Sequence, residues 1–366
     1  MEPLRPGDTI GVLGGGQLGR MLAMAAADLG LRTHIYAPEA NQPAAEVAAF
    51  STVADYTDTT PLDAFAGRCQ VVTFEFENIP TASLERLAGV VPLRPGLKSL
   101  EVSQDRLVEK QFIETLGVKV APFAPIDGPD DLAQAHAALG SDTILKTRRF
   151  GYDGKGQVSL RSGDVLRATE IWQTVGAVPA VLEARIPFVA EISCLLVRDA
   201  DGTIAAYDVP HNVHQRGILH TSSVGSLAAF RPTPAIASAA RSVTQKIAKA
   251  LGHIGLLTVE FFVTEAGDLL VNEIAPRVHN SGHWTMDACL NSQFDNHIRA
   301  VAGWPLATTE RHSDAQMHNL LGEDMNGPDA GLDQPEWKRH LYGKVDARPG
   351  RKMGHRTRLV PKEANP

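Results

Sequence analysis

Two glutamates, Glu260 and Glu273, have a spacing that suits a metal site. Apolar runs on either side of Glu265-Ala266-Gly267-Asp268 predict two antiparallel strands joined by a tight turn. With the turn at Ala266-Gly267, Glu260 is directly opposite Glu273, and both carboxylates project from one face because side chains alternate along a strand. Opposed like charges destabilise a hairpin unless a cation lies between them. Mg²⁺ in proteins takes one or two carboxylates together with phosphate oxygens, so the pair predicts a magnesium site.

The alternative for this hairpin is a pair of solvated glutamates on an exposed face of the sheet. Phe262 and Val271 are predicted to share the face of the two carboxylates, which indicates that the face is at least partly covered. The hairpin therefore favours the metal site over the solvated pair.

A glycine turn follows the first predicted strand, Ile10–Leu13. The turn, Gly14-Gly-Gly-Gln-Leu-Gly19, has GxGxxG spacing and precedes a helical pattern, so its backbone N–H groups could approach an anion. A dinucleotide site also needs an acidic residue closing the second strand. That strand, Thr33–Tyr36, is followed by an alanine and a proline before Glu39. We therefore expect a non-nucleotide phosphate site or a structural turn rather than NAD binding.

Polar side chains close the strand predicted at Val71–Asn78. Glu75, Glu77 and Asn78 come at its carboxyl end, where open parallel sheets bind their ligands. They are therefore candidates to face the same ligand as the glycine turn. For Asn78 the alternative is capping of the next helix, since Pro80 and a helical pattern follow.

A loop rich in glycine and basic residues follows the strand predicted at Thr143–Lys146. It reads Arg148-Arg-Phe-Gly-Tyr-Asp-Gly-Lys-Gly-Gln157. Glycines let backbone N–H groups approach an anion, lysine and arginine neutralise it, and such a loop can close as a lid. A solvated basic hairpin is the alternative, whereas a P-loop is excluded because no Gly-Lys-Ser/Thr opens a helix.

Length and composition narrow the class of protein. The 366 residues suffice for two or three domains, and 43% hydrophobic and 21% charged residues are ordinary for a globular chain. A net charge of −7 argues against a nucleic-acid binder, whereas basic clusters at 148–155 and 338–358 suit a small anionic ligand. The three cysteines are scattered, and no apolar run approaches the ~20 residues of a membrane helix. Without a signal peptide before the first strand, we expect a cytoplasmic protein with no nucleic-acid or membrane partner.

The remaining patterns predict alternating helices and strands. Ala235–Leu251 is a long amphipathic helix, His211–Gly217 a polar loop, and Asp287–Ala302 a closing helix. Histidine pairs at 211/214 and 279/283 have zinc-like spacing, but the first lacks a third ligand and the second lies in a predicted loop, which argues against zinc. From about residue 316 short strands, one of them at Lys344–Asp346, predict a small β-rich C-terminal domain.

Taken in order, these features resemble the ATP-grasp superfamily of carboxylate-amine ligases. The strings GGGQLGR, RRFGYDGKGQ, NEIAPRVHNSGHWT and YGK…RPGRKMGH are similar to one branch of it, the N5-carboxyaminoimidazole ribonucleotide synthetases of purine biosynthesis. The resemblance runs over essentially the whole chain. It implies an α/β and α+β fold: a Rossmann-like pre-ATP-grasp domain at 1–104, an ATP-grasp domain at 105–302 with a lid at about 120–186, and a β-rich domain at 303–366.

The resemblance implies that ATP binds between two subdomains with Mg²⁺ on Glu260 and Glu273. Glu191 would hold the ribose hydroxyls. Many ATP-grasp enzymes carry an asparagine two residues after the second glutamate, where Ala275 stands here, so Asn272 or water would complete the metal shell. The implied ATP-binding residues are Arg106, Lys146, Gly151, Tyr152, Asp153, Gly154, Lys155, Gly156, Gln157, Glu183, Ala184, Arg185, Ile186, Glu191, His214, Asn272 and Glu273.

The implied activity is the ATP-dependent carboxylation of aminoimidazole ribonucleotide by bicarbonate through carboxyphosphate. The resemblance makes Tyr152, Asp153, Arg277, His279 and Asn280 the catalytic residues. It makes Gly16, Gln17, Leu18, Glu75, Tyr152, Lys344, Arg351 and Lys352 the ribonucleotide-binding residues. The family suggests a homodimer. The alternatives are another ATP-grasp ligase, such as formate-dependent glycinamide ribonucleotide transformylase, and a nicotinamide-dependent reductase built on the glycine turn.

Overall fold

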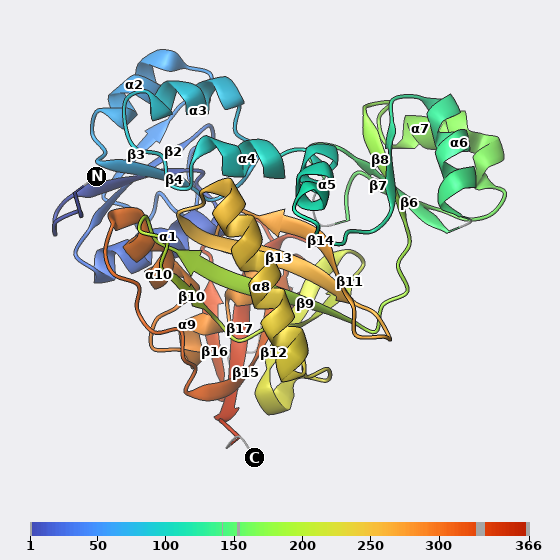
Figure 1. Cartoon of the computed structure of the whole chain (residues 1–366). Coiled ribbons are helices and arrows are strands. Elements are labelled where there is room, and N and C mark those ends of the chain that lie inside the picture. The colour runs from blue at the N-terminus through green and yellow to red at the C-terminus, as the bar shows by residue number, and fades with distance from the viewer. Residues whose placement is uncertain (1, 141, 152–153, 327–333, 364–366) are drawn as a thin grey trace.

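The computed structural model of the chain, which describes residues 2–140, 142–151, 154–326 and 334–363, is built on three β-sheets (Figure 1). The N-terminal sheet is parallel, with strand order β3-β2-β1-β4. Strands β1 and β4 are fully buried, as their apolar sequences predict. The elements of this domain are β1 (Thr9–Leu13), α1 (Gln17–Asp28), β2 (Arg32–Ala37), β3 (Phe50–Val53), α2 (Thr59–Ala66), β4 (Val71–Phe74), α3 (Thr81–Ala88) and α4 (Leu97–Ser103).

A small antiparallel sheet forms a lid subdomain that projects from the rest of the molecule (Figure 1). Its strand order is β5-β8-β6-β7, and its apolar side chains form a core of their own. The lid therefore has a hydrophobic core separate from those of the other two domains. Helix α5 (Arg106–Thr115) leads into the elements β5 (Phe123–Ile126), α6 (Pro129–Leu139), β6 (Thr143–Thr147), β7 (Gln157–Leu160), α7 (Ala168–Thr174) and β8 (Ala180–Ala184).

The largest sheet has nine strands, in the order β14-β13-β9-β11-β12-β15-β17-β16 with β10 paired to β9. Helix α8 packs on one face of β9 and β13, and α10 packs on the other. Its elements are β9 (Ala190–Arg198), β10 (Ile204–Ala206), β11 (His211–Gln215), β12 (Ile218–Val224), α8 (Pro234–Leu251), β13 (Gly255–Val263), β14 (Leu269–Ala275), α9 (Thr285–Ala288), α10 (Gln293–Ala302), β15 (Ser313–Leu321), β16 (Trp337–Leu341) and β17 (Lys352–Pro361).

The fold class predicted from the sequence is confirmed, but three predicted elements are wrong. The segment at His211–Gly217 is mostly strand β11, whose polar side chains hid the strand pattern. The closing helix is broken, because Ser292 caps a new helix through Phe294 N and Asp295 N. Residues Lys344–Asp346 form no strand. In addition, β15, β16 and β17 continue the central sheet through the β12–β15 pairing rather than forming a sheet of their own.

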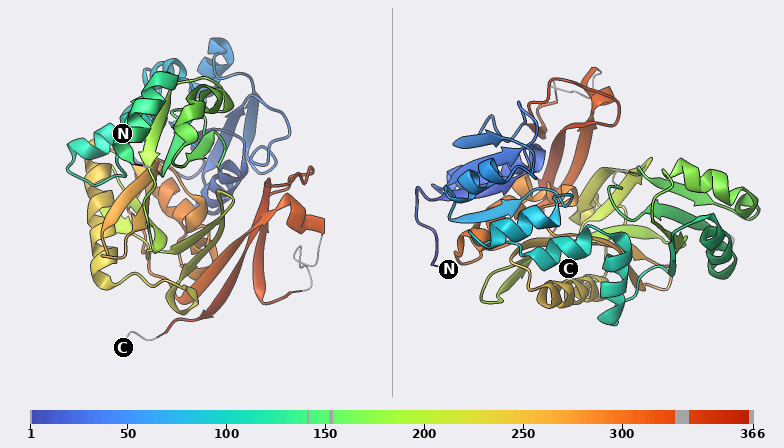
Figure 2. Two further views of the ribbon diagram at one scale, coloured as in Figure 1. Left: turned by 90° about the vertical axis from the view of Figure 1, so that its right-hand side faces the viewer. Right: turned by 90° about the horizontal axis from the view of Figure 1, so that it is seen from above.

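The N-terminal domain packs against the central and C-terminal strands, as the two views in Figure 2 show. Helices α1 and α10 lie against each other within one apolar core. His297 on α10 joins the two domains, since its Nε2 lies 2.9 Å from Thr73 Oγ1 and its Nδ1 accepts a hydrogen bond from Leu256 N. These contacts join the N-terminal domain to the central sheet.

Candidate active site

A cavity of about 660 Å³ opens where the N-terminal domain, the lid and the central sheet meet. Its walls hold most of the residues named from the sequence: Gln17, Leu18, Glu75, Arg106, Lys146, Gly151, Gly154, Lys155, Gln157, Arg185, Glu191, His214, Glu260, Asn272, Glu273, Arg277, His279, Asn280 and Lys352. Tyr152 and Asp153 lie outside the described residues. The remaining named residues do not line the cavity: Gly16, Gly156, Glu183, Ala184, Ile186, Lys344 and Arg351.

Strands β13 and β14 place Glu260 opposite Glu273, as predicted, but by a different register. Val263 pairs with Leu269 near the turn, and a β-bulge at Asn272 restores the register before the two glutamates. A bulge turns two successive side chains to the face of the residue opposite. Asn272 therefore joins Glu260 and Glu273, the pair called here the hairpin glutamates, in the cavity wall.

The same bulge makes one prediction wrong. Val271 is buried in the core on the far side of the sheet, because the extra residue reverses the alternation below Glu273. Phe262 does share the face of the hairpin glutamates, where it stacks on Phe188 with ring centroids 4.7 Å apart. The face is thus covered by an aromatic pair.

The pKa values of the two hairpin glutamates are shifted in opposite directions. Burial and the charge of Glu273 raise the pKa of Glu260 to about 7. Burial alone would raise the pKa of Glu273 too, but Arg106, with Nη1 3.0 Å from Oε2, and Lys146 hold it below its usual value. Within the part of the chain that the structure describes, Asn272 Oδ1 is buried without a hydrogen-bond partner. Two carboxylates and an unpaired amide oxygen are ligands that suit Mg²⁺. Among the described residues, no group of three or more His, Cys, Asp or Glu side chains is placed to hold a metal ion.

Helix α5 directs charged side chains into the cavity. Asp105 caps the helix through Leu107 N and also binds Arg148 of the lid, with its Oδ2 2.8 Å from Arg148 Nη2. The cap sets Arg106 toward Glu273. One turn later Glu109 lines the same wall and accepts a hydrogen bond from Ile274 N. Sequence reasoning missed Glu109, although its i, i+3 spacing from Arg106 puts both on one helix face.

Lys146 is held by a buried ionic triad rather than by solvent. Glu183 Oε2 lies 3.0 Å from Lys146 Nζ, and Glu183 Oε1 lies 3.3 Å from Lys110 Nζ. Lys110 and Glu183 are almost completely buried. Glu183 therefore fixes Lys146 from behind the cavity wall, and Lys110 on α5 is a second residue that the sequence analysis missed.

Glu191 on β9 and His214 on β11 form a close pair in the cavity. His214 Nδ1 lies 2.6 Å from Glu191 Oε2. Burial alone would lower the pKa of His214, but the contact with Glu191 and the charges of the hairpin glutamates raise it to about 9. The ring is thus cationic at neutral pH and contributes positive charge beside two carboxylates.

This pair predicts a pH-dependent stability. Because the folded pKa lies above the unfolded value, charged His214 stabilises the fold fully below about pH 6.5, and the contribution is lost as the pH rises through about 9. His214→Gln should therefore lower the free energy of urea unfolding most at acidic pH and least above pH 9. The exposed His312→Gln is the control and should show no such trend. A difference for His214→Gln that stays constant over this range would contradict the assignment.

The glycine turn is occupied by a side chain of the protein itself. Glu75 accepts hydrogen bonds from the backbone N–H groups of Gly16 and, at 2.7 Å, of Gly19. A Cβ on Gly16 would lie 2.6 Å from Glu75 Oε1, so the glycine is required by this close approach. The backbone N–H groups of Gly16 and Gly19 are thus bonded within the protein, at the place where a dinucleotide would need them.

Gly16→Ala should destabilise the protein by about 1–3 kcal/mol through overpacking against Glu75. Gly96→Ala is a matched control, since Gly96 also precedes a helix with extended backbone and its added Cβ would meet nothing within 4 Å. Urea denaturation of both variants measures the difference. Equal losses would show that Glu75 does not fill the turn in solution.

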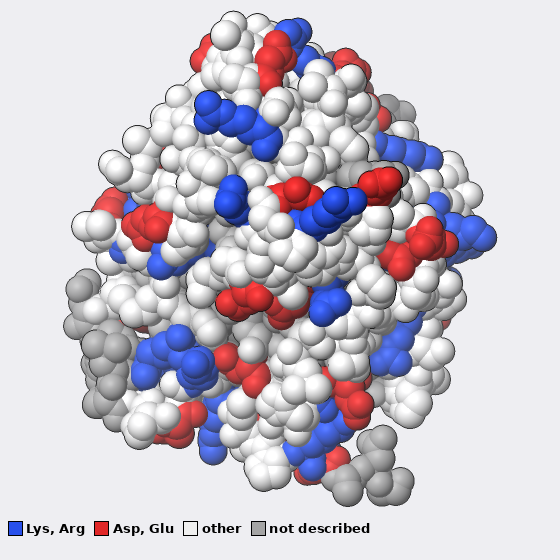
Figure 3. All heavy atoms as spheres, turned by 90° about the vertical axis from the view of Figure 1, so that its left-hand side faces the viewer, with Lys and Arg blue, Asp and Glu red and all other residues white. Residues whose placement is uncertain are grey.

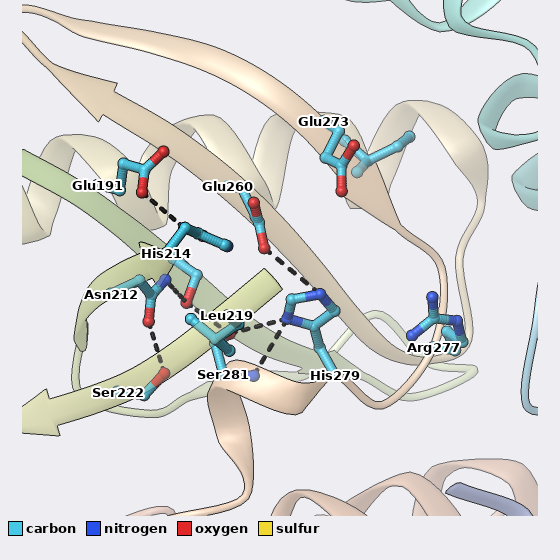
Figure 4. Close-up of polar contacts among 12 residues, drawn as sticks. Glu191, Asn212, His214, Leu219, Ser222, Glu260, Glu273, Arg277, His279 and Ser281 are labelled. Carbon is cyan, nitrogen blue, oxygen red and sulfur yellow. Dashed lines mark hydrogen bonds and ion pairs between the residues drawn. The ribbon is translucent and has the colours of Figure 1, made fainter. Parts of the chain in front are cut away.

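The segment after β14 supplies a polar corner to the cavity. Arg277 Nη2 pairs with Glu77 Oε1 at 2.7 Å. Burial, with Arg277 and Lys352 nearby, lowers the pKa of His279 well below its usual value, so the ring is neutral. Asn280 has both side-chain polar atoms buried without hydrogen-bond partners in the described structure. Figure 4 shows His279 between Arg277 and Glu260.

The C-terminal basic turn reaches the glycine turn. Lys344 Nζ donates to Gln17 Oε1 and to Lys352 O, each at 2.8 Å. Arg351 Nη1 instead donates to Asp346 O within the turn. Lys352 lines the cavity and Lys344 lies beside it, whereas Arg351 turns toward its own loop.

Basic and acidic side chains are interspersed over the face in Figure 3. No helix within the described part of the chain is long and apolar enough to cross a membrane.

Family models account for most of the chain. A model of the ATP-grasp domain matches residues 111–294, one of a ribonucleotide synthetase preATP-grasp domain matches 8–104, and one of a phosphoribosylaminoimidazole carboxylase C-terminal domain matches 315–365. Together with the lid and the carboxylate hairpin, these matches define an ATP-grasp protein. The exact limits of its domains stay a prediction.

Proteins of similar sequence and structure identify one family within the ATP-grasp class. The N5-carboxyaminoimidazole ribonucleotide synthase of Brucella melitensis is 48% identical over 98% of each chain. The N5-carboxyaminoimidazole synthetase of Staphylococcus aureus complexed with ADP has a TM-score of 0.93 at 36% identity, covering 98% of this chain and 95% of that one. The Aspergillus clavatus synthase in complex with ADP and 5-aminoimidazole ribonucleotide has a TM-score of 0.87 at 28% identity, over 98% and 95%. This chain belongs to the N5-carboxyaminoimidazole ribonucleotide synthetase family.

Proposed function

We propose that this chain carboxylates 5-aminoimidazole ribonucleotide with bicarbonate and ATP, giving N5-carboxyaminoimidazole ribonucleotide in purine biosynthesis. One observation supports this best: a single cavity is lined by two cations, Arg106 and Lys146, by the hairpin glutamates, and by Lys352 at the C-terminal basic turn. Such a cavity suits a reaction in which a phosphoryl group and then a carboxyl group pass between neighbouring ligands.

ATP is proposed to lie between the lid and the central sheet. Lys146 and Arg106 would neutralise its phosphates under the loop that contains Gly151–Gln157. The backbone of Glu183–Ile186 would border the adenine. The carboxylate of Glu191, held by His214, would accept hydrogen bonds from the ribose hydroxyls. Mg²⁺ would be held by the hairpin glutamates and Asn272 Oδ1, where it would neutralise developing charge on the transferred phosphoryl group.

The bicarbonate end is proposed to lie at Arg277, His279 and Asn280. Bicarbonate is a poor electrophile until one of its oxygens bonds to the γ-phosphorus with release of ADP, giving carboxyphosphate. Arg277 would neutralise the anion and the unpaired amide of Asn280 would orient it. The amine of the ribonucleotide then attacks the carbon and phosphate leaves, while lid closure excludes water. Tyr152 and Asp153 of the lid are proposed to orient the ribonucleotide or to handle the amine proton.

The ribonucleotide is proposed to bind beside the glycine turn. Gln17 and Leu18 line the cavity there, and Lys344 and Lys352 would pair with its 5′-phosphate. Arg351 could join them only by leaving Asp346 O. Gly16 and Glu75 would act indirectly, by shaping the turn.

Lys344→Met should raise the KM for aminoimidazole ribonucleotide by about 10–100-fold, because one charge-assisted phosphate contact is lost. The KM for ATP should stay unchanged. Lys338→Met, at an exposed lysine on β16, is the matched control. Steady-state kinetics with each substrate varied measures both values, and equal changes in the two constants would contradict the placement.

The test of the function is ADP release from MgATP with bicarbonate, in the presence and absence of aminoimidazole ribonucleotide. We expect strong stimulation by this ribonucleotide. Turnover driven instead by formate and glycinamide ribonucleotide would move the chain to the formate-dependent ligases. The nicotinamide alternative is disfavoured because Glu75 already fills the glycine turn.

A homodimer and a cytoplasmic location are further parts of the proposal. The family supports the first, and three free, buried cysteines are compatible with the second. Sedimentation at several protein concentrations tests the dimer, and a single species of about 39 kDa would contradict it.

A further inference from the structure

A row of buried polar side chains runs behind His279 in the central sheet (Figure 4). Ser222 Oγ donates to Asn212 Oδ1 at 2.7 Å, and Asn212 Nδ2 donates to Ser193 Oγ at 3.1 Å. Ser193 Oγ donates to Ser281 Oγ at 2.7 Å, and Ser281 Oγ lies 2.8 Å from His279 Nδ1. The other four residues of this row are each at most 2% exposed: Ser193, Asn212, Ser222 and Ser281. They are called here the polar relay.

The direction of the relay is fixed at both ends. At the histidine, the backbone N–H of Ser281 donates to Nδ1 at 3.3 Å, and a backbone N–H can only donate. At the other end, the amide nitrogen of Asn212 can only donate to Ser193. Because Ser193 Oγ accepts from Asn212, its own hydroxyl donates a hydrogen bond to Ser281 Oγ. The hydroxyl of Ser281 then donates to His279 Nδ1. Every group in the row is then used once as donor.

We propose that the polar relay holds neutral His279 with its proton on Nε2, so that His279 acts on the ligand as a hydrogen-bond donor. Nε2 is the ring nitrogen that faces the cavity, 3.4 Å from Glu260 Oε1. This inference rests on the proposed function. In it, His279 stabilises an anionic oxygen of bicarbonate or carboxyphosphate by donating a hydrogen bond from Nε2. It also excludes His279 as the base that takes the amine proton. Ser193, Asn212, Ser222 and Ser281 are positioning residues.

The relay explains polar residues that the fold alone does not need. Ser193 lies directly across from Glu260 in the β9–β13 pairing, and Asn212 lies across from Glu191. Apolar side chains at these positions would bury more surface in the sheet. A buried polar row is costly unless every member is satisfied, and in this one each hydroxyl and amide has a partner.

Asn212→Asp is the sharpest test because it reverses the relay without changing its shape. A carboxylate only accepts, so Ser193 would donate to it and Ser281 to Ser193, which leaves Ser281 Oγ to accept from His279. Long-range ¹H–¹⁵N spectra of the histidine rings distinguish the two tautomers, and His279→Gln identifies the signals among the 13 histidines. We expect protonated Nε2 in the wild type and loss of this pattern in Asn212→Asp.

Kinetics give the second readout. Asn212→Asp and Ser281→Ala should each lower kcat/KM for bicarbonate by about 10–100-fold with the KM for ATP unchanged. Ser281→Ala keeps the fold testable if a buried aspartate prevents folding. Ser223→Ala is the matched control, since Ser223 is equally buried on β12 but accepts from Gln316 instead.

Two results would overturn the relay: protonated Nδ1 in the wild type, or an unchanged ring pattern and unchanged kinetics in both variants. The spectra are independent of turnover. A folded protein with protonated Nε2 but no ribonucleotide-dependent ADP release would therefore support the relay and reject the proposed function.

Discussion

Glu273→Gln should lower kcat by at least about 100-fold, because it removes a carboxylate from the proposed magnesium site and the charge that orients Arg106. It should also bring the pKa of Glu260 down from about 7, since the charge of Glu273 is one of the causes that raise it. Stability should change by less than about 1 kcal/mol, because relief of the like-charge pair offsets the lost ion pair. ADP release measures the change in kcat, and urea denaturation measures the change in stability.

Glu265→Gln is the matched control for this variant. Glu265 is exposed at the turn of the same hairpin, so its substitution should change neither quantity. Turnover of Glu273→Gln within a few-fold of the wild type would remove the hairpin glutamates from the mechanism. A loss of activity that accompanies unfolding would be structural and would equally contradict the assignment.

Glu183→Gln should lower the free energy of unfolding by about 3 kcal/mol or more. It leaves Lys110, 1% exposed, and Lys146, 12% exposed, as two ammonium groups without a counter-charge between them. The KM for ATP should rise as well, because Lys146 loses the carboxylate that fixes it. Urea denaturation and steady-state kinetics measure these effects.

Asp142→Asn serves as its control. Asp142 pairs with Arg185 at 2.7 Å, but both side chains are about half exposed, and such pairs contribute at most about 1 kcal/mol. A loss of stability in Glu183→Gln no larger than that in Asp142→Asn would show that the buried triad does not fix Lys146.

Short-range patterns predicted the elements that carry the chemistry. The opposition of the hairpin glutamates, the basic loop after β6 and the parallel N-terminal sheet follow from alternation, turn residues and glycine spacing. The basic loop depends on residues close in the sequence, whereas the two glutamates face each other through a bulge that the turn residues did not predict. The family and fold class predicted from longer strings are confirmed by the relatives and the structure.

Features that depend on long-range packing were not predictable. The bulge at Asn272 decides on which face Val271 lies, and on that face Val271 joins a core with Ile113 of α5 and Ile192 of β9. Glu75 fills the glycine turn only because β4 lies beside β1. The polar relay was missed because Asn212 lies in a strand without an apolar pattern.

The central claim, that ATP activates bicarbonate within this one cavity, is tested most directly with ¹⁸O-labelled bicarbonate. An oxygen of bicarbonate that bonds to the γ-phosphorus stays with phosphate when the carbon is released to the amine. We predict one ¹⁸O in each inorganic phosphate formed during ribonucleotide-dependent turnover, measured by mass spectrometry. Carboxylated product formed together with unlabelled phosphate would contradict the account.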